Sequence, residues 1–318
     1  MSPSAILVEN ILQALVTSLL MGGVYGLLCV GLGLIFSIMR VINFAQGEFM
    51  MLGMYAALFA FGSLGLGAML GAWGGLVVSA LLAGVALYLL GAALHPGLLA
   101  RVTGARVSGT EGEGHYPQLI LTLGISLVMA NGGLLLFGSS QHTIQTPLSS
   151  DAWGLPLGAE MMVFFNKARS LSLVVALAMV LVVILFITRS RTGKTLRAAA
   201  DNPVAASYMG IDVSRAHRTA FALGGAVTGI AGGLLASSYP FQPYVGHEFI
   251  VIMYTGVVLG GMGSVKGALW GGILIGFIQQ MSSLFLPLQL QGTAIFLVFL
   301  LTLLLRPEGL FGRSTDRA

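Results

Sequence analysis

Polar residues that could line a path for a solute lie between the first two apolar stretches of the 318-residue chain. Asn43, Gln46 and Gly47 are three and four residues apart, so they share one face of a helical turn. Their amides and open backbone, with the carboxylate of Glu48, offer hydrogen bonds to a polar solute. Such groups are costly at membrane depth and face a bundle interior or a cavity. The open alternative is that Arg40 and Glu48 mark the membrane interface while the amides cap helices.

A second polar segment, residues 189–218, holds six of the chain's 15 Lys and Arg residues. The stretch from Thr195 favours a helix, and Asn202-Pro203 forms a turn that can cap a second one. Gly210 then supplies a helix stop. A loop that only carries positive charge needs neither small helical residues nor a stopping glycine. The segment is therefore predicted to be a short helix-turn-helix that docks onto a cytoplasmic partner.

Residues for catalysis or metal binding do not assemble into any known pattern. The five histidines are scattered, with no pair at the i, i+4 spacing of a zinc-binding helix. The glycine-rich run 260–267 lacks the Gly-Lys-Ser/Thr order of a phosphate loop, and no Gly-x-Ser-x-Gly elbow occurs. The chain is predicted not to be an enzyme, with no catalytic residue, metal or cofactor of its own.

The elements that must position these residues are membrane helices. Hydrophobic residues make up 56% of the chain and charged residues 8%, against about 25% charged in a soluble protein. The mean hydropathy is +0.93. With so few charges to cover a water-facing surface, the net charge of +4 is a topology signal and not a sign of nucleic-acid binding. Cys29 is the only cysteine, so an intrachain disulfide is excluded. It lies in an apolar run.

The predicted fold is all-α, a polytopic transmembrane bundle of about 8–9 spans forming one domain over 1–318. A span needs about 20 mostly apolar residues. The expected helices cover 11–38, 48–62, 66–94, 118–137, 171–188, 219–238, 249–261, 268–286 and 293–305. The second and seventh are short, so we expect them to be broken helices that line the pathway, because free backbone groups at membrane depth need protein or a water-filled cavity around them.

The basic residues predict the orientation, since cytoplasmic loops collect Lys and Arg. With the N-terminus outside and the C-terminus inside, 13 of the 15 fall on the cytoplasmic side. That set comprises Arg40, Arg101, Arg106, Arg189, Arg191, Lys194, Arg197, Arg215, Arg218, Lys266, Arg306, Arg313 and Arg317. Only Lys167 and Arg169 fall outside, in the long loop 138–170.

Glycines four residues apart, such as Gly22 with Gly26 and Gly256 with Gly260, predict close helix contacts. The pattern favours packing within the bundle, but the spacing does not distinguish it from a dimer interface.

Several motifs in order resemble one family. Segment 31–55, GLGLIFSIMRVINFAQGEFMMLGMY, closely resembles the signature of branched-chain amino acid ABC transporter permeases of the H type. TGKTLRAAADNP at 192–203, MGID at 209–212 and FALGGAVTGIAGG at 221–233 resemble the coupling loop and following helix of that family. TGVVLGGMGS at 255–264 and LRPEGLFG at 305–312 also match.

The resemblance implies one permease subunit of an ATP-driven importer in a bacterial or archaeal inner or plasma membrane. Its implied partners are a second, related permease, two cytoplasmic ATP-binding subunits that use ATP-Mg, and a periplasmic or extracellular amino-acid-binding protein. Asn43, Gln46, Gly47 and Glu48 would line or brace the pathway. The residues implied in ATPase coupling are Thr195, Leu196, Arg197, Ala198, Ala199, Asp201, Asn202, Ala205, Met209 and Gly210.

Two positions depart from the family pattern. The Glu-Ala-Ala of importer coupling loops is replaced by Arg197-Ala198-Ala199, and the following Gly210 is displaced. Where relatives commonly carry His-Gly-Asp, this chain has Gln46-Gly47-Glu48, which removes a titratable imidazole.

The substrate and two other classes of function stay open on the sequence. Branched-chain or other neutral amino acids are expected, with urea or short amides as the alternative within the family. A passive channel for a small solute would also use glycine-rich and broken helices, but paired Asn-Pro-Ala motifs are absent. A membrane enzyme lacks a converging catalytic set.

Overall fold

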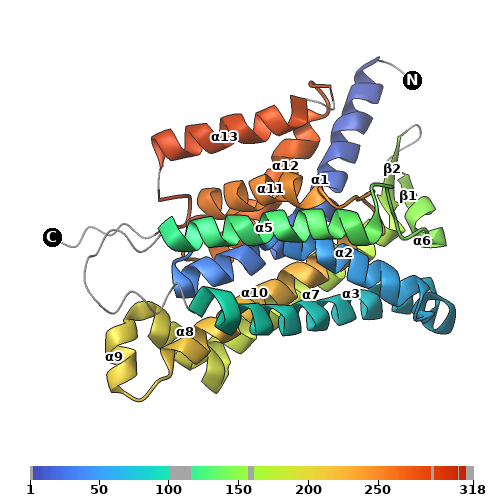
Figure 1. The fold of residues 1–318 in the computed structure, drawn as a ribbon. Coiled ribbons are helices and arrows are strands. Elements are labelled where there is room, and N and C mark those ends of the chain that lie inside the picture. Colours follow the sequence, from blue (N-terminus) through green and yellow to red (C-terminus); the bar gives the residue numbers. More distant parts are fainter. Residues whose placement is uncertain (1–2, 101–115, 157–160, 288–289, 307, 313–318) are drawn as a thin grey trace.

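The computed structural model describes residues 3–100, 116–156, 161–287, 290–306 and 308–312. The chain is almost entirely helical, and its helices gather into a bundle (Figure 1). The helices are α1 (Pro3–Met39), α2 (Gln46–Gly62), α3 (Leu66–Leu94), the π-helical turn η1 (His95–Leu99), α5 (Tyr116–Phe137), α6 (Pro147–Ser150), α7 (Lys167–Arg189), α8 (Arg191–Asp201), α9 (Pro203–Tyr208), α10 (Val213–Leu235), α11 (Val245–Gly260), α12 (Val265–Ser282) and α13 (Gln291–Leu305). The strands β1 (Ala152–Pro156) and β2 (Met162–Asn166) pair antiparallel.

All nine predicted membrane helices are present, which confirms the all-α fold. Within the described residues, five regions are long and apolar enough to cross a membrane: Ile6–Met39, Leu66–Leu99, Pro117–Phe137, Lys167–Arg189 and Val213–Leu235. The two helices predicted to be short have 17 residues (α2) and 16 residues (α11).

Most helices begin earlier than hydropathy predicted, α1 by eight residues at Pro3. α7 begins at Lys167, α10 at Val213 and α11 at Val245, each four to six residues before the expected start. Their first turns carry polar residues, which an apolar pattern leaves out. Asn166 and Asp212 cap α7 and α10 by accepting hydrogen bonds from backbone N–H groups of the first turn, so side-chain chemistry sets these two starts. Lys167 and Arg169 therefore lie in α7 and not in a loop.

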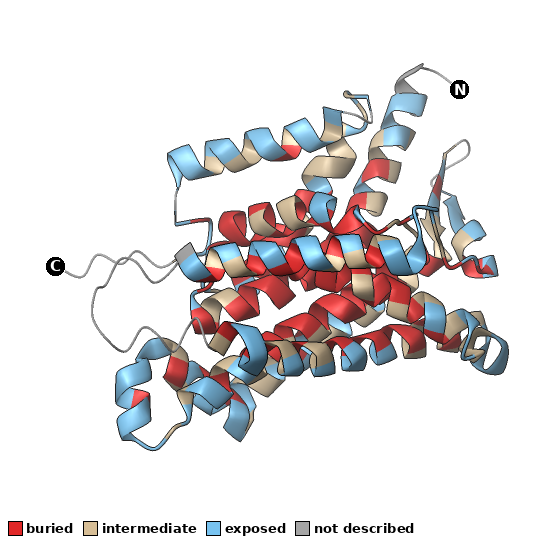
Figure 2. Ribbon diagram, in the orientation of Figure 1, coloured by how far each residue is buried: buried red, intermediate tan, exposed pale blue. Residues whose placement is uncertain are grey.

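Glycine contacts between helices lie inside the bundle. A Cβ on Gly22 of α1 would lie 2.9 Å from the carbonyl oxygen of Ile273 in α12, and one on Gly256 of α11 would meet Gly272 of α12. These backbones approach too closely for larger residues, as in other membrane bundles. Buried residues concentrate along α1, α2, α10 and α11 at the centre of the bundle (Figure 2).

The segments before and after α7 lie at opposite ends of the bundle (Figure 1). α6 and the hairpin occupy one end, and α8 and α9 occupy the other. Gln13 ties the hairpin to α1 through two 2.9 Å hydrogen bonds, to the backbone N–H and carbonyl of Phe164. This arrangement separates the two loops as the charge pattern predicted. Of the basic residues in that pattern, Arg101, Arg106, Arg313 and Arg317 lie outside the described residues.

Candidate functional site: a helix junction, a surface helix pair and a polar cavity

The predicted amide pair closes a hydrogen-bond network at the start of α2. The Asn43 Nδ2 group donates to Gln46 Oε1 at 2.9 Å, and the backbone N–H of Ala45 donates to Asn43 Oδ1 at 3.2 Å. Gln46 Nε2 donates to the carbonyl of Gly224 at 3.2 Å and to the hydroxyl of Thr228, both in α10. Asn43 and Gln46 have no exposed surface in the chain. Their amides therefore fix α2 to α10.

This network lies at membrane depth. At a rise of 1.5 Å per residue, α10 is about 33 Å long. Gly224 lies about 17 Å and Thr228 about 22 Å from its start at Val213. Since Gln46 contacts both, α2 begins near the middle of α10. α2 is thus a helix that starts inside the bilayer.

The start of α11 meets the start of α2 at the same depth. A Cβ on Gly47 would clash with the carbonyl oxygen of Gly246, and a Cβ on Gly246 would lie 2.7 Å from the Glu48 carboxylate. Glu48, 1% exposed, also lies 3.3 Å from Nδ1 of His247, measured from its Oε1. The free N–H ends of both helices favour a negative charge there. The four residues predicted from the sequence are therefore brought together at what we call the helix junction, residues 43–48 and 245–247.

The helix junction favours bracing over lining as the role of these residues. Their side chains are buried among α2, α10 and α11 and not open to a path within this chain. His247 differs from them, because its side chain is 48% exposed. Nothing in its sequence context marked it as a partner of Glu48, which is 199 residues earlier.

The predicted helix-turn-helix is present as α8 and α9. Ser190 accepts a hydrogen bond from the N–H of Gly193 at 2.8 Å and so caps α8. Asn202 caps α9 by accepting from the N–H of Ala205 at 2.9 Å. Gly210 follows with a φ of 80°, a conformation that favours glycine.

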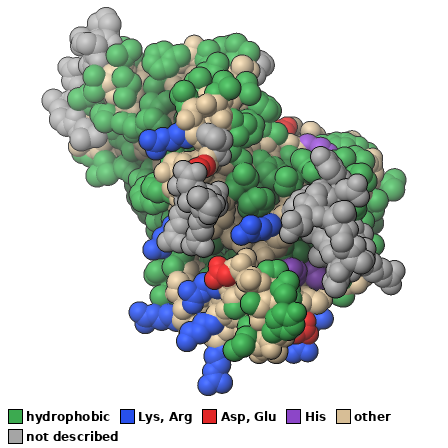
Figure 3. Space-filling model, turned by 90° about the vertical axis from the view of Figure 1, so that its left-hand side faces the viewer, with side chains coloured by type: hydrophobic (Ala, Val, Ile, Leu, Met, Phe, Trp, Pro, Cys, Tyr) green, Lys and Arg blue, Asp and Glu red, His purple; other side chains and the backbone are tan. Residues whose placement is uncertain are grey.

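The α8–α9 pair presents one face to the bundle and the other to the surroundings. Leu196 and Ala199 are buried where α8 packs on α7, α10 and α1, and Ala206 is the buried residue of α9. These positions anchor the pair, so Leu196 and Ala199, two of the residues implied in ATPase coupling, are buried within this chain. Of the other predicted coupling residues, Ala198 is half-buried, and the exposed ones are Thr195, Arg197, Asp201, Asn202, Ala205, Met209 and Gly210. Viewed from this end, Lys and Arg side chains gather around the pair (Figure 3).

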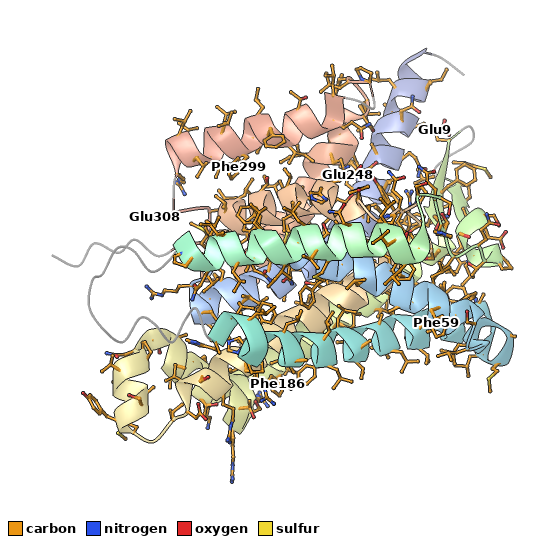
Figure 4. All side chains as sticks on the ribbon, viewed as in Figure 1. Glu9, Phe59, Phe186, Glu248, Phe299 and Glu308 are labelled. Carbon is orange, nitrogen blue, oxygen red and sulfur yellow. The ribbon has the colours of Figure 1, made fainter. Side chains whose placement is uncertain are left out.

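A polar cavity of about 490 Å³ lies between the helix junction and the hairpin end of the bundle, and sequence reasoning missed it. Helix ends converge on it: Arg169 from the first turn of α7, Glu248 from the first turn of α11 and Gln279 from the last turn of α12. Figure 4 labels Glu248. The sequence does hold a signal for this cavity. Arg169 and Glu248 lie just before apolar runs, where the first turns of helices are expected.

Aromatic rings form the inner side of this polar cavity. Tyr25 and Tyr239 line it, and both pack edge-on against the buried ring of Phe249, at centroid distances of 5.9 and 5.1 Å. The Tyr239 hydroxyl donates to Glu248 Oε2 at 3.2 Å. Burial, with the Glu248 carboxylate beside it, raises the pKa of Tyr239 to about 12, so this hydroxyl stays protonated and keeps donating.

Three features together define a multi-pass membrane permease. They are the membrane-length helices, the two short helices that start inside the bilayer, and the anchored surface helix pair. The chain belongs to the family described as the permease component of the branched-chain amino acid transport system, which matches residues 14–305.

Similar proteins cover nearly the whole chain. The chain is 30% identical over 314 residues to the high-affinity branched-chain amino acid transport system permease protein BraD of Pseudomonas aeruginosa, covering 96% of this chain and 97% of that one. It is 28% identical over 303 residues to the corresponding permease protein LivH of Escherichia coli K12, covering 95% and 96%. A probable branched-chain amino acid transport permease of Methanocaldococcus jannaschii is 28% identical over 294 residues, covering 90% and 88%. No solved structure matches.

Proposed function

We propose that this chain is one permease subunit of an ATP-driven importer of branched-chain amino acids. Its partners in this proposal are a second, related permease, two cytoplasmic subunits that bind and hydrolyse ATP-Mg, and a binding protein that delivers the amino acid from outside. The chain itself binds no nucleotide and carries no catalytic residue. The membership of a branched-chain amino acid permease family supports the substrate class.

The observation that carries the proposal is the α8–α9 pair. It is anchored to the bundle by Leu196 and Ala199, whereas Tyr208 and Met209 are 85% and 83% exposed. Large apolar side chains at the tip of a charged surface segment are typical of a contact with another protein. We infer that an ATP-binding subunit occupies this face.

A continuous set of contacts supports transmission from this face into the bilayer. α8 packs against α10, Gln46 ties α10 to α2, and the contact of Gly47 with Gly246 ties α2 to α11. Displacement of α8 would therefore act on both short helices at the helix junction. Alternating access follows if this junction moves when the ATP-binding subunits close.

The orientation is part of the proposal. The N-terminus and the hairpin lie outside, and α8, α9 and the C-terminus lie in the cytoplasm of a bacterial or archaeal cell. The basic residues around α8 and α9 support this side as cytoplasmic.

The test is affinity purification of the tagged chain from its native membranes in mild detergent, followed by reconstitution of the recovered complex into liposomes. We expect a second permease and two ATP-binding subunits to copurify, and leucine uptake to require ATP and the binding protein. Recovery of this chain alone, with leucine flux that does not depend on ATP, would replace the importer with a passive channel.

A further inference from the structure

The polar cavity carries one cation and one anion that do not pair with each other. Among the described residues, the ion pairs are those of Lys167 with Asp151, Arg215 with Asp212, and His247 with Glu48. Arg169 and Glu248 both line the cavity and form no ion pair within that part of the chain. Opposite charges that share a cavity without meeting leave room for a ligand that carries both signs.

Each charge suits one group of an α-amino acid. The planar guanidinium of Arg169 stays charged and matches a carboxylate with two parallel hydrogen bonds. The Glu248 carboxylate accepts one hydrogen bond from Tyr239 and retains lone pairs for an ammonium group. A neutral solute such as urea would leave both charges without a counter-charge, which is unfavourable in a partly desolvated site.

The remaining walls combine apolar side chains with amides. Met21, Tyr25, Tyr239, Pro240 and Val245 supply apolar surface, and the amides come from Gln141, Gln242, Gln279, Gln280 and Gln291. The volume of about 490 Å³ lies within the range of about 300–1,000 Å³ that is typical of small-molecule sites. The apolar surface can contact an aliphatic side chain, and the amides can hydrogen-bond the polar head of the same ligand.

We propose that this cavity is a binding site for the zwitterionic head of a neutral amino acid, with Arg169 binding the carboxylate and Glu248 the ammonium group. The inference deepens the proposed function, because it assigns the transported class of solute to particular residues of this chain.

The first turn of α11 links the site to the helix junction. Val245 and Glu248 line the cavity, whereas Gly246 and His247 contact Glu48 on α2. The next residue, Phe249, packs against the rings of Tyr25 and Tyr239. A ligand held by Glu248 therefore contacts the helix that also meets the buried carboxylate of α2.

The test is equilibrium binding of radiolabelled leucine to the purified native complex, without binding protein or ATP. The wild-type complex is expected to bind leucine saturably, and Arg169→Gln and Glu248→Gln are each expected to weaken binding at least tenfold. Arg169→Lys and Glu248→Asp retain the charges and are expected to restore part of the affinity, which a folding defect would not allow. Lys167→Gln and Glu9→Gln change nearby charges outside the cavity and are expected to stay within twofold of wild type.

Competition by analogues tests the assignment of each charge. Leucine amide lacks the carboxylate and 4-methylpentanoate lacks the ammonium group, so both are expected to compete poorly in the wild type. Arg169→Gln is expected to abolish the preference for leucine over leucine amide.

Three outcomes would overturn the assignment. They are no leucine binding by the wild-type complex, unchanged binding in both Arg169→Gln and Glu248→Gln, and displacement of bound leucine by urea as well as by leucine. Leucine binding with the expected losses, in a complex whose uptake does not depend on ATP, would support the site and reject the ATP-driven mechanism. The two proposals thus fail on different readouts.

Discussion

The two polar segments found in the sequence use their polar groups in opposite ways. At the helix junction, Gln46 and Glu48 direct their side chains to other helices, Asn43 bonds to Gln46, and all three side chains are buried. In the α8–α9 pair, Ser190 and Asn202 bond only to the backbone of their own helices. The first segment thus holds the bundle together, and the second leaves its outer face for a partner. Substitutions should therefore separate them: stability is sensitive at the junction, and assembly is sensitive at the surface pair.

The largest effect is expected from Gly47→Val. A side chain at Gly47 would clash with the carbonyl of Gly246, and backbone cannot move aside as a flexible side chain can. We expect a loss of about 3 kcal/mol or more, the upper range for overpacking, with a matching fall in the melting temperature of the detergent-solubilised protein. Gly62→Val in the same helix is the matched control, because no atom lies within 4 Å of a Cβ at that position. Equal melting temperatures for the two variants would contradict the close contact of α2 with α11.

Gln46→Ala should have the next largest effect. It removes the bonds to Asn43, Thr228 and the carbonyl of Gly224 and leaves buried groups without partners. Each such group costs about 1–3 kcal/mol, so thermal unfolding should shift clearly, and leucine uptake should fall with it. Gln145→Ala, at an exposed position, should change neither. Reduced uptake at wild-type stability would instead mean that Gln46 lines the pathway.

The contrast between the regions also explains what the sequence could reveal. Caps, a proline at the start of a helix and a glycine stop are local signals, so the sequence predicted both helices and the turn between them, although α8 begins at Arg191, four residues before the predicted start. Which side of a short helix packs on the bundle is not a local signal, so the sequence did not show that Leu196 and Ala199 are buried.

Contacts between distant residues left no such signal. The approach of Gly246 to Glu48 joins helices about 200 residues apart, and single-sequence spacing cannot show it. The charges of the polar cavity were missed for a second reason. Arg169 and Glu248 lie in first turns that hydropathy trimmed from α7 and α11, so both were read as loop residues.

A smaller and local effect is expected from Asn202→Ala, which removes the cap of α9. Capping side chains contribute about 1 kcal/mol to a helix end. Because α9 lies at the surface, we expect faster amide hydrogen exchange over residues 204–209 with an unchanged melting temperature for the bundle. Ser207→Ala is the control within α9, since its exposed hydroxyl bonds only to the carbonyl of Val204. A global loss of stability in Asn202→Ala would place α9 among the elements that hold the fold.

The smallest effect on stability, and the clearest on assembly, is expected from Tyr208→Ser combined with Met209→Ser. Both side chains are more than four-fifths exposed, so the change in unfolding free energy should stay below about 0.5 kcal/mol. Capture of the ATP-binding subunits by the tagged chain should fall markedly, because the exposed apolar tip of α9 is removed. Tyr244→Ser, at an exposed tyrosine outside the α8–α9 pair, should leave capture unchanged. Full recovery of the ATP-binding subunits by the double variant would show that the outer face of α9 is not their contact, and would move the search to the charged residues of α8.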